Sequence, residues 1–359
     1  RIVRRPSEMF FADVARRQGV VRYQVAGGPG RVALLTHPAH IKALMTADPA
    51  LAPSATRMSP LAPIVGSQSV LTSIGQRHRR QRSMLLPRFH GKAVAAYRDG
   101  IDTATATHID AWPTGELVPV ADIAQQITLD VIMSAVFGLP GGVPATDAER
   151  ALRDSTLRML RWSATPVATV AQLLNSRSSA PVGLTKMVLR PLDRALYQVL
   201  AERRGENDSG RNDITQLLLD TRDEDGEPLP DSEIRDELVT LLLAGHETTT
   251  NAVAWTFERL TRYPDVYADA REAVQAGNDN YLDALLNESM RTRPVVPVVA
   301  RTLMVPWQFG DQQLESGVTA LVSVLLLHHR DDLYPRPFAF DPSRFFDVRP
   351  TAHTLMPFG

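Results

Sequence analysis

The sequence contains no cysteine among its 359 residues. This excludes disulfides, zinc–thiolate sites, iron–sulfur ligation and thiol nucleophiles in the chain as given. The absence is consistent with a reducing cytoplasm, where we expect the protein to reside. Lysine is scarce as well, since Lys42, Lys92 and Lys186 are the only ones. Arginine therefore supplies nearly all the positive charge, which together with many alanines suggests a GC-rich coding bias rather than a function.

Net charge and long apolar runs are also lacking. The chain has 39 basic and 40 acidic residues, a formal net charge of −1, which argues against a nucleic-acid partner and against a basic membrane-surface protein. No run approaches the ~18 apolar residues of a membrane-spanning helix, and the longest candidate, Thr319–Leu327, is too short. We expect no transmembrane segment and no secretory signal. The first residue is not Met, so we expect the sequence to begin inside a longer chain.

Periodicity and breaker residues predict a mainly helical chain with small β-sheets. We find no internal repeat or linker and expect one domain over 1–359, incomplete at both ends. Two strands are predicted across a glycine-rich turn at 27–30, and small strands return after Pro294. The two strands on either side of the turn are expected at 20–25 and 31–35. The helices are expected at 7–19, 38–45, 76–86, 91–111, 122–137, 147–174, 186–204, 214–221, 231–262, 265–276, 281–292 and 322–328.

The helix over 231–262 is the strongest prediction, and it would span about 48 Å. Its apolar centre predicts that it is buried. Inside it lies Ala244-Gly245-His246-Glu247-Thr248-Thr249-Thr250, where Gly and three threonines are poor helix formers. A buried Glu247 would be costly unless paired or protonated, and threonine hydroxyls favour a water-filled bulge. The segment indicates a proton relay, although a helix turning polar near the surface would look the same.

Two further patterns involve arginine and carboxylate. Glu288 and Arg291, at i and i+3, share a helix face, as in many solvated surface pairs. Arg344 stands between phenylalanines in Phe340-Asp341-Pro342-Ser343-Arg344-Phe345, and a buried arginine there would need a carboxylate partner, for which Glu288 is a candidate. An ordinary Asp-Pro turn with a solvated arginine is the alternative.

A basic helix begins at Gly75 and carries His78 and Arg82 one turn apart on one face. Arg79 and Arg80 point elsewhere on the same helix. One face could therefore hold an anionic ligand while the other meets an acidic partner. A basic solvated face is the common alternative.

The order of these motifs resembles the cytochrome P-450 family of haem-thiolate monooxygenases. Gly75-x-x-His78-x-x-x-Arg82 is similar to the C helix of the family, and Ala244-Gly245-x-Glu247-Thr248-Thr249 to its oxygen-activating segment. Glu288-x-x-Arg291 and Arg344 resemble its Glu–Arg–Arg cluster. Pro357-Phe358-Gly359 resembles the opening of its haem-binding loop. The resemblance implies a cytochrome P-450 fold without the C-terminal ligand loop and the helix after it.

The resemblance also implies roles for single residues. Glu247 and Thr248 would be catalytic, relaying protons to dioxygen bound at the haem iron. Haem b would lie against Ala244, Gly245 and Phe358. Its propionates would be held by His78, Arg82 and Arg301. Glu288, Arg291 and Arg344 would be structural, fixing the segment beneath the haem.

Substrate and partners follow from the same resemblance. Segments 51–70, 157–173 and 295–299 would line the pocket, and their apolar character suggests a hydrophobic small molecule. Dioxygen would be the co-substrate. Electrons would come ultimately from NAD(P)H through a ferredoxin or flavodoxin-type donor, which Arg79, Arg80 and Arg88 could meet.

One departure concerns the missing cysteine. In the family a cysteine thiolate follows the Phe-Gly of the loop and ligates the iron, but the chain as given stops before that position, so no metal ligand is assigned. We expect this polypeptide not to show the carbon-monoxide band of a thiolate-ligated ferrous haem. The expected function is that of a bacterial monooxygenase of which this is a partial sequence. The alternatives are a truncated, inactive relative acting as a binding or scaffold protein, and a helical ligand-binding protein of similar composition.

Overall fold

The computed structural model describes residues 19–25, 30–58, 61–90, 95, 97–113, 115–175, 178, 180–206 and 210–358. The chain forms two compact units: unit 1 comprises residues 1–55 and 248–359, and unit 2 comprises residues 56–247. The long helix α12 (Asp231–Arg262) contributes to both units. Its bounds coincide with the predicted 231–262. The expectation that the chain is one domain stays a prediction.

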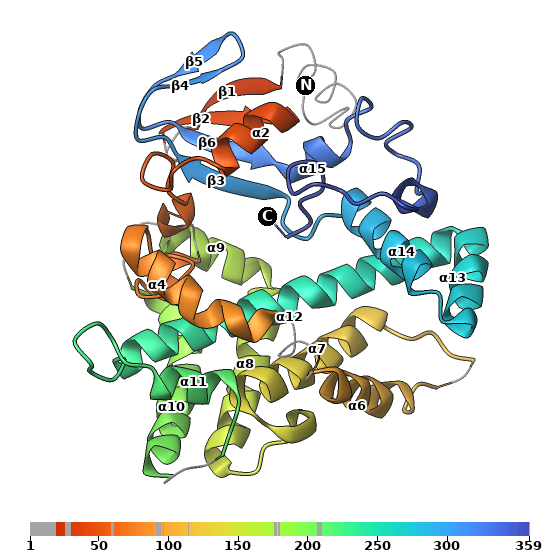
Figure 1. Cartoon of the computed structure of the whole chain (residues 1–359). Coiled ribbons are helices and arrows are strands. Elements are labelled where there is room, and N and C mark those ends of the chain that lie inside the picture. Colours follow the sequence, from red (N-terminus) through yellow and green to blue (C-terminus); the bar gives the residue numbers. More distant parts are fainter. Residues whose placement is uncertain are drawn as a thin grey trace. The chain divides into compact units, whose positions relative to one another are not determined.

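Unit 1 is built around a four-stranded mixed sheet in the order β1-β2-β6-β3, with β4 and β5 forming a separate pair (Figure 1). The strands are β1 (Val20–Val25), β2 (Gly30–Leu35), β3 (Val298–Thr302), β4 (Trp307–Phe309), β5 (Gln312–Leu314) and β6 (Thr319–Ser323). The parallel pairing of β2 with β6 joins segments nearly 300 residues apart, with Val32 opposite Thr319. The two predicted N-terminal strands are confirmed.

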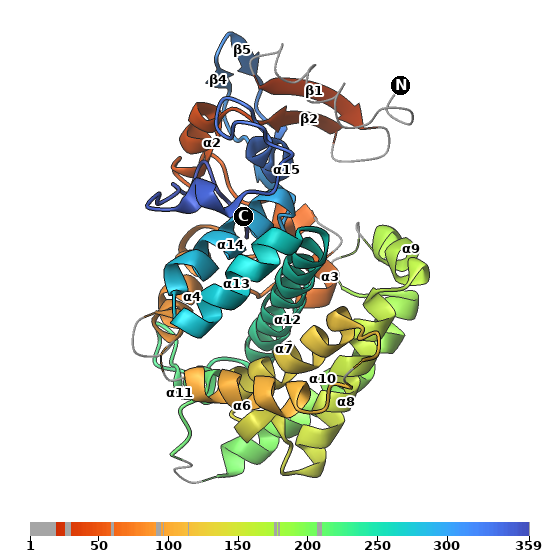
Figure 2. The same ribbon diagram turned by 90° about the vertical axis from the view of Figure 1, so that its right-hand side faces the viewer.

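The helices of unit 1 are α2 (Pro38–Met45), α13 (Pro264–Ala276), α14 (Asp279–Thr292), α15 (Val324–His328) and the 3-10 turn η4 (Pro342–Phe345). In unit 1, α13 and η4 contact α14, α14 contacts α15, and α15 contacts β3 of the four-stranded sheet. Figures 1 and 2 show α13 and α14 running side by side. Between them Gly277 takes a left-handed conformation (φ 64°) that ends α13, which a glycine adopts without steric cost.

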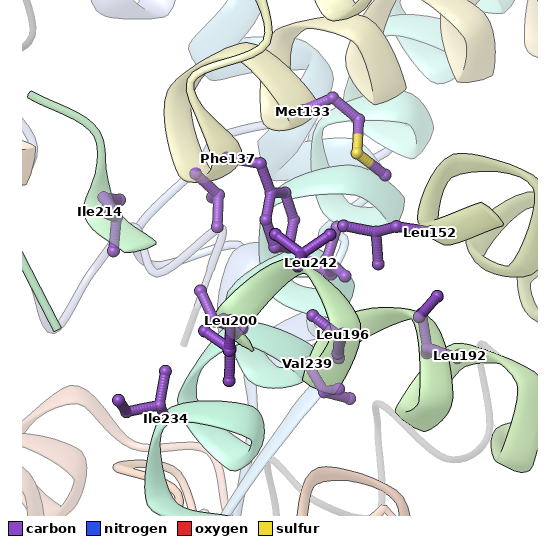
Figure 3. Close-up of a cluster of buried hydrophobic side chains, with 14 of the residues drawn as sticks. Met133, Phe137, Leu152, Leu192, Leu196, Leu200, Ile214, Ile234, Val239 and Leu242 are labelled. Carbon is purple, nitrogen blue, oxygen red and sulfur yellow. The ribbon is translucent and has the colours of Figure 1, made fainter. Parts of the chain in front are cut away.

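Unit 2 is helical. Its elements are η1 (Ala55–Met58), α3 (Ala62–Val65), α4 (Gly75–Leu85), η2 (Leu86–Phe89), α6 (Arg98–Ile109), α7 (Val120–Phe137), η3 (Pro140–Gly142), α8 (Asp147–Ser163), α9 (Pro166–Asn175), α10 (Gly183–Gly205) and α11 (Ile214–Asp220). The apolar faces of α7, α8, α10 and α11 meet the first half of α12. Figure 3 shows this core, in which Met133, Phe137, Leu152, Leu196 and Leu242 point toward one another.

The structure departs from the predicted elements in a few places. The single helix expected at 147–174 is two helices, because Pro166 starts α9 and the Thr165 hydroxyl accepts a hydrogen bond from the Ala168 amide. The segment 51–70, expected to line a pocket, contains η1 and α3. The helix expected at 7–19 and the turn at 27–29 lie outside the described residues, as do residues 91–94 of the helix expected at 91–111.

One helix among the described residues, α7, is long and apolar enough to cross a membrane by length and composition. Core helices pass the same test, so this is weak evidence. Leu129, Met133 and Phe137 of α7 belong to the core of unit 2.

Candidate functional site

A buried ion cluster joins α14 to η4 in unit 1. Glu288 and Arg291 lie one turn apart on α14, and neither side chain has solvent-exposed surface. Arg291 Nε donates to Glu288 Oε2 at 2.6 Å, and Arg291 Nη2 donates to Oε1 at 2.8 Å. Arg344 brings its Nε to 3.5 Å from Glu288 Oε1 and is almost buried. The structure therefore brings the three predicted residues together, and the alternative of solvated surface residues is wrong.

Arg291 also binds the chain that follows α15. Its guanidinium donates to the carbonyl oxygens of His328 (2.8 Å), Pro337 (2.8 Å) and Ala339 (3.1 Å). The planar fork of an arginine carries five N–H donors, so one side chain satisfies both a carboxylate and three carbonyls. Glu288 Oε1 accepts a further hydrogen bond from the Asp341 amide, at 2.8 Å. The cluster thus fixes the course of residues 328–341 on α14.

His328 belongs to the same buried centre, and the sequence reasoning did not single it out. Its ring is fully buried, and this burial lowers its pKa to about 3. Met356 N lies 2.8 Å from Nε2, and Arg291 O lies 3.2 Å from Nδ1. The only sequence signal was a histidine at the end of the apolar run Val324–Leu327.

The centre of α12 carries the predicted relay residues in a different setting from the one expected. Ala244 and Glu247, one turn apart, are exposed, and Thr248 is half-buried. The expectation of a buried Glu247 is therefore wrong, because this face of the apolar helix is not covered. The Ser163 hydroxyl of α8 lies 3.0 Å from Glu247 Oε1 and is placed to donate to it. The helix shows no bulge here, since residues 231–262 are α-helical throughout.

The two residues between these positions face α7. A Cβ added at Gly245 would lie 2.5 Å from Ile132 Cδ1, so the glycine allows α7 and α12 to approach closely. His246 is buried, and its Nε2 lies 3.0 Å from the Gln125 carbonyl oxygen. Burial lowers the pKa of His246, which favours a neutral ring that donates this hydrogen bond.

Some basic side chains of helix α4 are exposed to solvent, whereas others bind residues of unit 2. Arg77 and Arg80 donate to Glu233 at 3.0 and 2.9 Å, and Gln81 Nε2 donates to the same carboxylate at 3.0 Å. Glu233 is buried near the start of α12. Arg77 and Arg80 therefore bind an acidic residue of their own unit, Glu233. Of the predicted propionate-binding residues on α4, Arg82 is exposed and His78 is half-buried.

Arg88 and Arg79 were predicted to meet a redox donor together with Arg80. Arg88 Nη1 donates to the Asn212 carbonyl oxygen at 3.1 Å, whereas Arg79 is exposed. Of the three arginines, two are therefore held by residues of unit 2.

Arg301 on β3 of unit 1 has an unusual environment. Its Nε is buried and has no hydrogen-bond partner among the described residues. Burial lowers the pKa of its guanidinium. A buried cationic N–H without an acceptor is costly, and it fits an arginine whose carboxylate partner is a bound group.

The loop before α4 was expected to line a pocket, and the structure fixes its last residues on α12. The amides of Gln68 and Val70 donate to Asp236 Oδ2 and Glu237 Oε1, each at 3.0 Å. The Ser69 hydroxyl lies 2.6 Å from the Thr240 hydroxyl. Burial raises the pKa of Glu237 to about 7. These contacts make residues 68–70 a fixed wall of unit 2.

The end of the chain lies on the buried centre of unit 1. Phe358 is half exposed, and Gly359 lies outside the described residues. The Val296 amide donates to the Pro357 carbonyl oxygen at 3.4 Å. In the part of the chain that the structure describes, no cluster of three or more His, Cys, Asp or Glu side chains could hold a metal ion.

Comparisons with known proteins agree on one family. The family model described as Cytochrome P450 matches residues 4–359. A Mycobacterium tuberculosis protein assigned as cytochrome P450 135A1 is 32% identical over 367 residues, covering 98% of this chain and 78% of the relative. A Mycobacterium bovis protein assigned as cytochrome P450 135B1 is 35% identical over 363 residues, covering 98% of this chain and 75% of the relative.

Solved structures show the same fold. A cyanobacterial CYP120A1 with bound retinoic acid has a TM-score of 0.77 at 21% identity, covering 100% of this chain and 82% of that one. A second structure, of the cytochrome P450 CYP102L1, has a TM-score of 0.73 at 20% identity, covering 94% of this chain and 78% of that one. The predicted mainly helical fold with small sheets is confirmed.

Proposed function

The chain belongs to the cytochrome P450 family. We propose that it acts as a haem-dependent monooxygenase, which inserts one oxygen atom of O2 into a hydrophobic small molecule. Membership of the family implies an oxidoreductase with haem as cofactor and a redox partner as electron source. When bound, the haem supplies the site of dioxygen activation and oxygen transfer. The observation that supports this proposal most directly is the buried, unpartnered Nε of Arg301.

Arg301 fits a haem propionate for a physical reason. A guanidinium N–H that is buried without an acceptor loses its hydration and gains nothing in return. A propionate at this point would supply the missing acceptor and a charge-assisted hydrogen bond. His78 and Arg82 would hold propionate oxygens from α4, where they lie one turn apart on one face.

Glu247 and Thr248 would move protons during the reaction. The Glu247 carboxylate is exposed, so it can take up a proton from water. The adjacent Thr248 hydroxyl both accepts and donates a hydrogen bond, and it would pass a proton onward. Ala244, one turn before Glu247 and equally exposed, would leave room for the haem.

A hydrophobic substrate is supported by apolar side chains on the expected lining segments. Leu51 and Val298 of unit 1 are exposed, as are Leu61 and Val167 of unit 2. Exposed apolar side chains on binding segments favour an apolar ligand. A ferredoxin or flavodoxin-type donor is proposed as the electron source, and a cytoplasmic location fits such partners.

A haem titration tests the proposal. The chain should take up haem with a Soret absorbance change, and Arg301→Leu should weaken this uptake by tenfold or more, since it removes a charge-assisted hydrogen bond. Arg349→Leu, at an exposed arginine of the same unit, is the matched control and should bind as the wild type does. Absence of haem uptake by the wild-type chain, and by a chain extended past Gly359 through the family's ligand loop, would overturn the proposal.

The relay has its own test in the extended chain. Thr248→Ala should uncouple oxygen consumption from product formation while leaving haem content unchanged. Unchanged coupling would remove Thr248 from the relay.

A further inference from the structure

The side chain of His328 stands between two backbone segments of unit 1. Met356 N lies 2.8 Å from its Nε2, and Arg291 O lies 3.2 Å from its Nδ1. Met356 is followed directly by Pro357 and Phe358. The ring thus connects the end of α14 to the residues that enter the predicted haem-binding loop.

These two contacts define the protonation of the ring. A backbone amide can only donate, so Nε2 must accept from Met356 and carry no proton. Nδ1 therefore carries the proton and donates to the Arg291 carbonyl oxygen. Burial, which is the largest cause, and the nearby Arg291 charge both lower the pKa of His328 to about 3. The ring is accordingly neutral in this single tautomer at neutral pH.

The contact with Arg291 is reciprocal. The Arg291 guanidinium donates to the His328 carbonyl oxygen at 2.8 Å, while the His328 ring donates to the Arg291 carbonyl oxygen. His328 is therefore held on both its backbone and its side chain by one residue of the buried cluster. Because its carbonyl oxygen and its Nδ1 are both held by Arg291, the His328 ring can set the position of the amide that its Nε2 binds.

A second side chain supports the same segment. The Tyr334 hydroxyl donates to the Thr354 carbonyl oxygen at 3.0 Å, and its ring lies 5.1 Å from the Arg291 guanidinium carbon. Met356 itself is buried in one hydrophobic cluster with Val322 and Leu327. Residues 354–356 are thus held by two separate hydrogen bonds, to Tyr334 and to His328, and both of these side chains contact Arg291.

We propose that His328 is a positioning residue, which fixes the backbone of Met356 through Nε2 and so sets the entry of the chain into the loop begun by Pro357 and Phe358. That this loop contacts haem rests on the proposed function. The hydrogen bond to Met356 itself does not.

Two amide variants, each keeping one of the two ring contacts, separate the contact with Met356 from the contact with Arg291. His328→Gln places an amide oxygen near the position of Nε2 and can still accept from Met356. His328→Asn places its amide near the position of Nδ1 and cannot reach Met356. The Gln variant keeps the acceptor for the Met356 amide but loses the donor to the Arg291 carbonyl oxygen, and the Asn variant does the reverse. His329→Gln is the matched control at the neighbouring histidine, whose Nδ1 lies 2.8 Å from the Leu325 carbonyl oxygen.

Amide hydrogen exchange on the 359-residue chain without haem gives the first readout. His328→Asn should speed exchange at the Met356 amide by roughly fivefold to tenfold, the loss expected for one hydrogen bond. His328→Gln and His329→Gln should leave it near the wild-type rate, and amides of β2 and β6 should be unchanged in all variants. Equal Met356 exchange in the Asn and Gln variants would overturn the proposal.

Haem titration of the same variants gives the second readout. His328→Asn should bind haem more weakly than His328→Gln, because Phe358 would no longer be held at the loop entry. If neither the wild-type chain nor the chain extended past Gly359 takes up haem, the proposed function fails while the exchange result still decides the role of His328. If haem binds equally in all variants although exchange at Met356 differs, His328 fixes Met356 but not the loop, and the proposal fails in its second half.

Discussion

Replacing Arg291 by alanine should unfold the part of unit 1 that surrounds α14. The fully buried Arg291 side chain donates to both oxygens of Glu288 and to three backbone carbonyls. Removing one partner of a buried ion pair costs about 3–5 kcal/mol, and each stranded carbonyl adds about 1–3 kcal/mol. These terms overlap, but together they approach the ~5–15 kcal/mol by which a domain is stable.

Urea unfolding followed by circular dichroism measures this loss, and hydrogen exchange locates it in α14 and residues 328–341. Arg150→Ala is the matched control. Arg150 also pairs with an acid at i−3, but this pair with Asp147 is largely exposed, so its loss should cost less than about 1 kcal/mol. Arg291→Lys should recover little, because an ammonium group has three donors and no planar fork.

The result that would refute this reasoning is a similar, small loss for Arg291→Ala and Arg150→Ala. Water would then have to replace five hydrogen bonds inside unit 1, and the buried cluster would not determine the course of residues 328–341.

Three further predictions concern unit 2. Burial raises the pKa of Glu237 from 4.5 to about 7, so the folded protein binds this proton more tightly than the unfolded chain does. Urea unfolding across pH should therefore show about 3 kcal/mol of stability that is present below pH 4.5 and is lost as pH rises through 7. A Glu237→Gln variant without this pH dependence would confirm Glu237 as its source. Gly66→Ala should cost about 1–3 kcal/mol, because φ is +88° and a Cβ would lie 2.0 Å from Asp236 Oδ2; a neutral effect on the melting temperature would contradict this. Phe137→Ala should cost about 3–5 kcal/mol by opening a cavity in the core of Figure 3, and binding of a small apolar ligand to the variant would verify the cavity.

Much of the secondary structure could be predicted from the sequence because local signals were strong. The bounds of α12 follow from a capping residue at Asp231 or Ser232 and from Pro264 beyond its end. The division of 147–174 into α8 and α9 was missed, although Pro166 was visible, because the apolar period continues across it.

The candidate site was predictable in composition but not in environment. Glu288, Arg291 and Arg344 were identified, whereas the exposure of Glu247 was predicted wrongly. The character of α12 as a whole is apolar, but burial of one residue depends on which neighbour covers its face. Gly245 and His246 face α7, and Ala244 and Glu247 do not.

The sequence by itself determined the order of helices and strands, the family and the residue types available for chemistry, because periodicity, capping and motif spacing are local properties. Tertiary structure alone decided which charges are buried and which atoms lack a partner. Arg291 and Arg301 look alike in the sequence, yet one is satisfied by five acceptors and the other has a buried Nε without any among the described residues. That difference arises because residues 328, 337 and 339 become neighbours of Arg291 only when the chain folds back on α14.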